Sequence, residues 1–327
     1  MRRVIYTAAI VMAASFVQID RISYSPLAAQ DRVASILSAT RAAMGGEDKI
    51  AGVKTLTAEG PFRRTMGQRD MEGTVIVSLA RPDKMHRVED MAMGGMIGGP
   101  TIERTMVLAG TTSWEDVQNR GGMGGGMRIV MAGPGAPGPG GGTMTQEQID
   151  EARTRRMRVQ MHRLTAALFA DAAAQWVDAG IAESPDGKAD ILEAKEETGR
   201  TLRLFIDQNT RLPLMVQYQD PKPRVMINNG GPGGPGRGPG GPGGPGRAPG
   251  DAAPMTPEQI KERMAELQRT PPEMGTFAMH LGDYKKVDGI MLPHKIETSL
   301  DGEPNEEWTI EKYKVNAAIK PETWQKK

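Results

Sequence analysis

A run of glycine and proline, GGPGGPGRGPGGPGGPGRAP, fills residues 230–249 and limits what this chain can fold into. The run has almost no side chain to bury, so it cannot offset the entropy lost on ordering, and we predict a disordered spacer. A collagen-like triple helix is excluded because the glycine register fails at Pro239. Nucleic-acid binding is disfavoured because Arg237 and Arg247 are its only cations and no aromatic ring is present for stacking.

A second run of the same kind, residues 121–142, shows that the first is not isolated. Each run is followed by a similar phrase, TMTQEQIDEARTRRM after one and PMTPEQIKERMAELQ after the other. In both phrases a threonine precedes a glutamine by three residues, which predicts a capping box at a helix start, at Thr145 with Gln148 and at Thr256 with Gln259. We interpret the two segments as related insertions into an older domain.

The N-terminus, MRRVIYTAAIVMAASFVQI, has two arginines, a short apolar core and a polar exit, which is typical of a secretory signal peptide. We therefore predict a signal peptide over residues 1–29, cleaved near Ala29, and a periplasmic or secreted protein. No second apolar run approaches membrane-spanning length. The chain has no cysteine, so a lipidated cysteine anchor and disulfide bonds are both excluded.

Charge and the remaining pattern indicate an ordinary globular domain over residues 30–327, interrupted at 121–142 and 229–254. The 41 basic and 40 acidic side chains are balanced, which gives no reason to expect nucleic acid or an anionic membrane as a partner. The phrase DRVASILSATRAAMGG predicts one leading helix, and GTVIVSLARPDK, TLRLFIDQNTRLPLMVQYQ and later phrases alternate with a period of two. Many consecutive strands with few helices predict an α+β domain with one curved antiparallel sheet.

The order of phrases resembles that of the LolA/LolB-like outer-membrane lipoprotein-sorting proteins. The resemblance rests on KTLTAEG, ARPDKMHRVE, LAGTTSWE, LFIDQNTRLPLMVQYQ and VDGIMLPHKIE, and it covers most of residues 31–324 apart from the insertions. It implies an incomplete β-barrel with an apolar concave face, lid helices across its mouth, and a non-catalytic carrier of acyl chains. The carriers have a positively charged cavity residue, for which Arg63, Arg64 and Arg87 are the candidates here.

Strand alternation also predicts which side chains line the concave, ligand-binding face. An apolar residue at every second position would either fill the interior or leave a cavity for alkyl chains. The predicted lining residues are Val75, Val77, Leu79, Trp114, Leu204, Val216, Phe277, Leu281, Trp308 and Ile310. The partner is then a hydrophobic ligand, a lipid or lipoprotein acyl chain, together with an envelope protein.

Enzymatic chemistry is disfavoured because the usual motifs are missing. No nucleophile elbow or phosphate loop occurs, and we expect no catalytic residue and no cofactor. The four histidines lack the paired spacing of a zinc site, and we expect no resident metal: His86, His162, His280 and His294.

Methionine is unusually frequent, with 23 residues, and it leaves alternatives open. The stretch 85–96 holds Met85, His86, Met91, Met93 and Met96, whose soft thioethers suit Cu(I), so an exported copper-binding protein is one alternative. Methionine is also an adaptable apolar residue, and we favour a flexible lipid-facing loop for this stretch. A non-catalytic scaffold or interaction role for the Gly/Pro arms is a third hypothesis.

Overall fold

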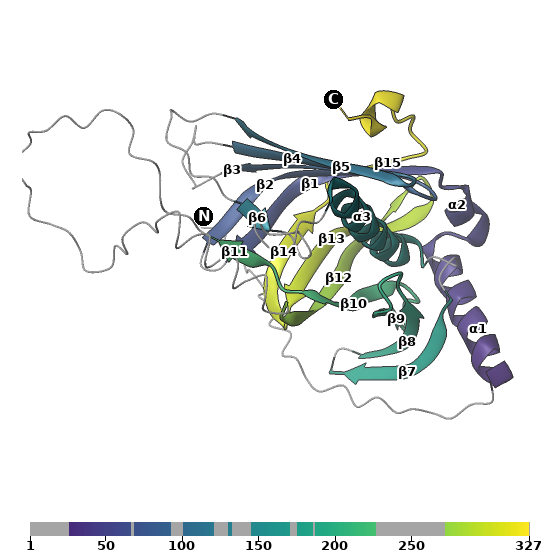
Figure 1. Cartoon of the computed structure of the whole chain (residues 1–327). Coiled ribbons are helices and arrows are strands. Elements are labelled where there is room, and N and C mark those ends of the chain that lie inside the picture. Colours follow the sequence, from purple (N-terminus) through teal and green to yellow (C-terminus); the bar gives the residue numbers. More distant parts are fainter. Residues whose placement is uncertain are drawn as a thin grey trace, which may run out of the picture.

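The computed structural model describes residues 26–66, 69–92, 101–120, 130–132, 145–170, 175–185, 187–226 and 272–326. Within these ranges thirteen strands form one antiparallel sheet (Figure 1). Their bounds in chain order are β1 (Thr55–Met66), β2 (Arg69–Ala80), β3 (Lys84–Ala92), β4 (Thr101–Ala109), β5 (Thr112–Arg120), β7 (Val177–Ser184), β8 (Gly187–Lys195), β9 (Thr201–Asp207), β10 (Pro213–Pro221), β12 (Met274–Val287), β13 (Ile290–Leu300), β14 (Glu303–Thr309) and β15 (Lys312–Val315).

The sheet is curved but open. Its strand order is β5-β4-β3-β2-β1-β14-β13-β12-β10-β9-β8-β7, with β15 also pairing with β1. The two edge strands, β5 and β7, pair only with β4 and β8, so the sheet does not close on itself. The predicted α+β fold with an incomplete β-barrel is confirmed.

Two glycines allow the tight curvature beside β1. A Cβ atom on Gly60 would lie 2.0 Å from the carbonyl oxygen of Thr309, at the point where the partner of β1 changes between β14 and β15. A Cβ atom on Gly73 in β2 would lie 1.9 Å from the carbonyl oxygen of Asp90. Neighbouring backbones approach this closely only where a side chain is missing.

Helix α3 (Gln146–Phe169) lies across the concave side of the sheet and connects the segment after β5 to that before β7 (Figure 1). The predicted capping box is present: the hydroxyl of Thr145 accepts from the backbone N–H of Gln148 at 3.2 Å, and the Gln148 side chain accepts from the backbone N–H of Thr145 at 2.9 Å. The helix ends at Ala170, whose φ of 45° is left-handed. The predicted lid over the sheet is thus a single long helix.

Two further helices, α1 (Pro26–Met44) and α2 (Glu47–Gly52), precede the sheet, and a short 3-10 helix, η1 (Pro321–Trp324), follows it. The leading helix ends at Met44, just before Gly45 as predicted, because Gly45 has a positive φ of 127°. A Cβ atom on Gly45 would lie 2.3 Å from the carbonyl oxygen of Gly289, so only glycine fits there. The predicted cleavage point near Ala29 falls within the first turns of α1, and residues 1–25 lie outside the described ranges, so export stays a prediction. No helix in the described ranges is both long and apolar enough to span a membrane.

The described part of the first Gly/Pro insertion forms a short strand. Strand β6 (Val130–Ala132) pairs with β11 (Arg224–Met226), just before the second insertion, in a separate two-stranded ladder. For residues 130–132 this corrects the prediction of disorder across 121–142, because their backbone pairs with a partner strand. The rest of both insertions, and the second capping box at Thr256 and Gln259, lie outside the described residues.

Candidate functional site

The concave face of the sheet, beneath α3, is where most of the predicted lining residues meet. Strand register places them side by side: Val77 faces Ala58 across β1 and β2, and Val216 faces both Leu204 and Met279. We call the apolar side chains of the core cluster on this face, the methionines included, the floor. Eight predicted residues belong to its single core cluster and are all buried: Val75, Val77, Leu79, Leu204, Val216, Leu281, Trp308 and Ile310. They pack in one cluster that also includes side chains of α3.

Phe277 and Trp114 lie apart from that cluster. Phe277 is buried on the same face, and its ring stacks on Tyr218 with the centroids 5.4 Å apart. Trp114 alternates along β5 with Ser113 and Glu115, which face α3, so its ring lies on the opposite, convex face. There it borders a surface hollow of about 480 Å³ with residues of η1, and its indole N–H donates to the carbonyl oxygen of Trp324 at 3.4 Å. The structure does not bring Trp114 to the floor.

Methionine is concentrated on the floor. Eight methionines belong to the core cluster, five of them on strands, two on α3 and one at the end of α1: Met71, Met85, Met91, Met106, Met279, Met157, Met161 and Met44. The prediction of a flexible methionine loop over 85–96 is wrong for residues 85–92, because they lie in strand β3 and alternate between the two faces. Met85 and Met91 face the core, His86 faces the convex side, and Met93 and Met96 lie outside the described residues.

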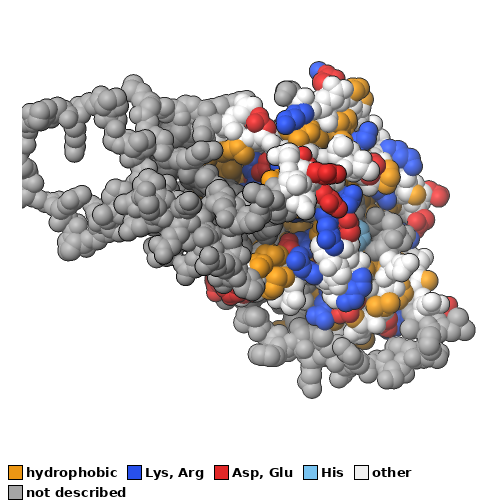
Figure 2. Space-filling view, in the orientation of Figure 1, with side chains coloured by type: hydrophobic (Ala, Val, Ile, Leu, Met, Phe, Trp, Pro, Cys, Tyr) orange, Lys and Arg blue, Asp and Glu red, His pale blue; other side chains and the backbone are white. Residues whose placement is uncertain are grey.

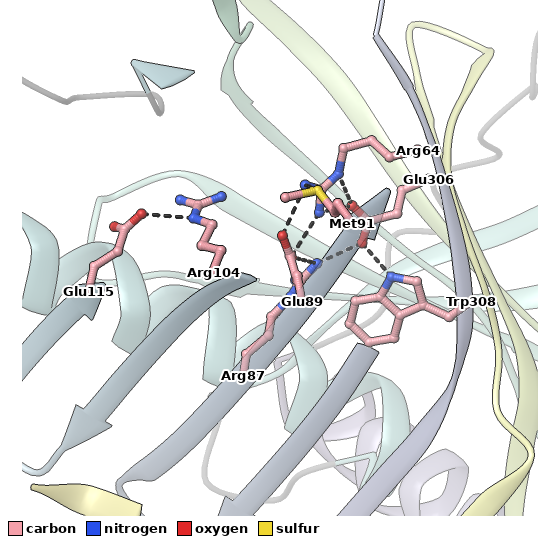
Figure 3. Close-up of polar contacts among 8 residues, drawn as sticks. All are labelled: Arg64, Arg87, Glu89, Met91, Arg104, Glu115, Glu306 and Trp308. Atoms are coloured by element: carbon pink, nitrogen blue, oxygen red, sulfur yellow. Dashed lines mark hydrogen bonds and ion pairs between the residues drawn. The ribbon is translucent and has the colours of Figure 1, made fainter. Parts of the chain in front are cut away.

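Beyond the floor, a group of charged side chains occupies the same concave face (Figure 3). Arg64 follows Phe62 on β1, and Arg87 and Glu89 stand between Met85 and Met91 on β3. Arg64 Nη2 lies 2.8 Å from Glu89 Oε1, and Arg64 Nε donates to Glu306 Oε2 at 2.6 Å. Arg87 Nη2 lies 2.5 Å from Glu89 and 2.8 Å from Glu306. We call these four residues the balanced cluster.

The balanced cluster keeps its charges although it is buried. Burial by itself favours the neutral carboxyl, but the guanidiniums of Arg87 and Arg64 outweigh that effect and hold the pKa of Glu89 far below its usual range. Burial likewise acts on Glu306, and the same two arginines lower its pKa. Arg87 also lies over the ring of Trp308, 4.6 Å from the centroid, and the Trp308 indole donates to Glu306. Charge pairing and ring contacts therefore replace the lost water.

Helix α3 is attached to both halves of the sheet by polar contacts. On the β5 side, Ser113 and Thr154 share a hydrogen bond of 2.9 Å, and Arg156 Nη2 donates to Glu115 at 3.1 Å. On the other side, the guanidinium of Arg163 binds Glu196 with two hydrogen bonds of 2.6 and 2.9 Å. We call these three contacts the latch. Figure 2 shows basic and acidic side chains side by side over the region of α3.

Arg163 continues the charged surface across the concave face. It binds Asp220 at 2.9 Å and lies over the ring of Tyr218, 3.6 Å from the centroid. Burial raises the pKa of Tyr218 to about 12, although the nearby Arg163 charge acts in the opposite direction. Asp220 in turn pairs with Arg200 at 2.6 Å. The interior beneath α3 therefore combines an apolar floor with paired charges.

The sequence reasoning named three candidates for a positively charged interior residue, and the structure separates them. Arg64 and Arg87 lie on the concave face, whereas Arg63 lies on the convex face, is 55% exposed and pairs with Glu307. The sequence reasoning did not identify Glu89 and Glu306, the carboxylates that neutralise Arg64 and Arg87. The sequence did contain a signal for Glu89, because it occupies the same face of the strand as the buried Met85 and Met91.

The described ranges contain no group of side chains that suits a metal site. There, no three His, Asp or Glu side chains are grouped so that they could hold a metal ion. The four histidines lie on separate elements, and His294 is fixed by a 2.7 Å contact between its Nδ1 and the carbonyl oxygen of Ile310. With Met85 and Met91 packed in the core, the copper hypothesis is unsupported.

The sequence matches no family model and no curated protein. Among solved structures, it is similar to a DUF1329 family protein from Desulfovibrio piger (8% identity, TM-score 0.40, 90% of this chain and 97% of that one). It is also similar to a putative outer membrane lipoprotein-sorting protein domain from Vibrio parahaemolyticus (8%, 0.41, 89% and 94%). A third is a LolA superfamily protein from Nitrosomonas europaea (9%, 0.38, 90% and 97%). Two of these three structures are described as a lipoprotein-sorting protein domain and as a LolA superfamily protein.

Proposed function

We propose that this protein is exported and carries or binds an amphiphile with lipid-like chains, such as a lipid or the acyl chains of a lipoprotein, without catalysis. In this proposal the mature protein works in the periplasm or outside the cell. The chains of the ligand occupy the floor, in the space that α3 fills when it is closed. Nine of the ten predicted lining residues contact them, namely the eight buried residues of the core cluster and Phe277. Trp114 is not among them, because it lies on the convex face.

The observation that carries this proposal is the methionine content of the floor. A core that only has to be filled is best built from leucine, isoleucine and valine, whose rotamers are well defined. Methionine is unbranched and flexible, so it specifies a core poorly but repacks easily around a partner of variable shape. Eight methionines in one cluster, two of them on the covering helix, favour a surface that exchanges α3 for another apolar partner.

The open edges of the sheet make that exchange feasible. Because β5 and β7 are not hydrogen-bonded to each other, α3 can move away without breaking any strand pair. The contacts that must break are the latch, the ion pairs of Arg163 with Asp220 and of Arg158 with Glu197, and the apolar contacts that α3 makes with the floor. A lipid chain restores the apolar contacts that the helix gives up.

A pair of engineered cysteines tests whether α3 is the lid. The chain has no cysteine, and the hydroxyls of Ser113 and Thr154 are 2.9 Å apart, so Ser113→Cys with Thr154→Cys should form one disulfide between β5 and α3. We expect the reduced variant to bind a fluorescent fatty-acid probe saturably, the oxidised variant to lose at least about tenfold in affinity, and dithiothreitol to restore it.

The matched control joins two strands that are already paired. The hydroxyls of Thr57 and Ser78 are 3.1 Å apart on β1 and β2, so Thr57→Cys with Ser78→Cys introduces a disulfide of similar span away from α3. Oxidation of this control should leave probe binding unchanged. Equal binding by the oxidised and reduced forms of the α3 variant would place the ligand elsewhere, and no saturable binding by the unmodified protein would contradict the carrier proposal itself.

A further inference from the structure

The charges beneath α3 form two groups that differ in balance. In the balanced cluster, two arginines face two carboxylates, and each carboxylate contacts both arginines. Its side chains are at most 14% exposed, so the cluster is neutral and enclosed. Such a group is complete as it stands and has no charge to offer a ligand.

The second group has one carboxylate for two arginines. Glu115 accepts from Arg104 Nε at 2.8 Å with one oxygen and from Arg156 Nη2 at 3.1 Å with the other. Among the described residues, Glu115 is the one carboxylate that pairs with either guanidinium. Figure 3 shows Arg104 directed toward Glu115 and away from the balanced cluster. The ion pairs of this group therefore leave one positive charge unmatched, while Glu89, opposite Arg104, and Asp220, near Arg156, act on the two arginines only at longer range.

That charge is costly in the absence of a further anion. Burial lowers the pKa of Arg156, and the neighbouring cations Arg104 and Arg153 lower it further, against the opposing effect of Glu115. The side chains of Arg104 and Arg156 are 17% and 23% exposed, so a group arriving from outside can reach them. An arriving anion would relieve the repulsion between the two arginines.

The position of this group relates it to the floor. Arg104 shares its face of β4 with Ile102 and Met106, and Arg156 precedes Met157 on α3. A headgroup at these arginines can therefore belong to the same molecule as chains on the floor. Guanidinium groups bind planar carboxylates and phosphates with paired hydrogen bonds.

Resting on the proposed function, we infer that the bound amphiphile has an anionic headgroup, a carboxylate or a phosphate, held by Arg104 and Arg156 between β4, β5 and α3. Glu115 pairs with both guanidiniums while α3 is closed, and the headgroup replaces Glu115 as their partner when α3 moves away. The site thus selects among amphiphiles by headgroup charge while the floor accepts their chains.

Competition with the fluorescent fatty-acid probe tests the inference with four ligands that share a twelve-carbon chain: dodecanoate, dodecyl phosphate, dodecyl maltoside and dodecyltrimethylammonium. We expect both anionic ligands to bind about tenfold or more tightly than the neutral and cationic ones. Arg156→Gln should remove that preference. Arg158→Gln is the matched control, because Arg158 lies on the same helix but pairs with Glu197 on the outside, and it should keep the preference.

A third variant predicts a change in the opposite direction. Glu115→Gln keeps the shape of the side chain and removes the competing charge, so affinity for dodecanoate and dodecyl phosphate should rise several-fold. A purely structural role for Glu115 would instead weaken binding of all four ligands. Circular dichroism of each variant verifies that it is folded.

The outcomes separate this inference from the proposed function. Equal affinity for all four ligands, unaffected by Arg156→Gln, would overturn the inference and leave the carrier proposal standing. Absence of binding by any of the four would contradict the carrier proposal. Displacement of the probe by inorganic phosphate as effectively as by dodecyl phosphate would also overturn the inference, since the anion would then be bound without the chain.

Discussion

The two ends of the concave face are built from different chemistry, although the same strands run through both. At the end near α2, β1 contributes Leu56, which faces Leu79 on β2. At the other end of the same strand and on the same face, β1 contributes Arg64, which forms an ion pair with the buried Glu89 on β3. One face of one strand thus changes from hydrocarbon to paired charge, and the comparison teaches that burial alone does not define the character of a binding face.

A charge placed at the apolar end tests that contrast most strongly. Leu204 is fully buried on the floor, so Leu204→Glu buries a carboxylate with no cation beside it, and we expect a loss of more than about 4 kcal/mol in the free energy of unfolding. Urea denaturation measures the loss. Leu214→Glu, on the neighbouring strand at a side chain that is 39% exposed, is the matched control and should cost less than about 1 kcal/mol. Similar losses for both would mean that the floor is open to water.

Removal of one charge at the other end should have the next largest effect. Glu89→Gln leaves Arg64 and Arg87 buried with Glu306 alone to neutralise them, which should cost about 3–5 kcal/mol. Glu307→Gln is the control on the convex face, where Glu307 pairs with the exposed Arg63, and should cost less than about 1 kcal/mol. If thermal denaturation gave equal losses for the two, the balanced cluster would be no more than a surface ion pair.

Acid should weaken the charged end by a smaller amount. Glu89 and Glu306 have lowered pKa values in the folded protein, so their contribution is fully present above the unfolded glutamate pKa of about 4.3 and is lost as pH falls below it. We expect the free energy of unfolding to decrease from pH 5 to pH 3, at up to about 1.4 kcal/mol per pH unit and group. Glu89→Gln should flatten that slope, and an unchanged slope would assign the acid sensitivity to other carboxylates.

The fold was predictable because its signals are local. Period-two alternation identified the strands and their apolar face, and the spacing of Thr145 and Gln148 identified the start of α3. The position of Trp114 on the convex face could not be predicted. The inner face of its strand carries the polar residues Ser113 and Glu115, so the alternation of apolar and polar residues does not show which face is buried. Pairing of Arg64 with Glu306 joins residues distant in sequence, and only the sheet order brings them together.

The meeting of β1 with β14 and β15 has a consequence for the order in which this protein acquires its structure. The first strand of the sheet finds its second partner almost at the end of the chain, with Phe62 opposite Trp308 and Leu56 opposite Val315. Contacts so distant in sequence form slowly, since the whole intervening loop must be closed first. The pairing of β1 with β14 and β15 therefore forms later than the hairpins of β1 to β5, whose partners are neighbours in sequence. The seam between β1 and β14, and not the appearance of the first strands, is therefore the step that joins the two halves of the sheet.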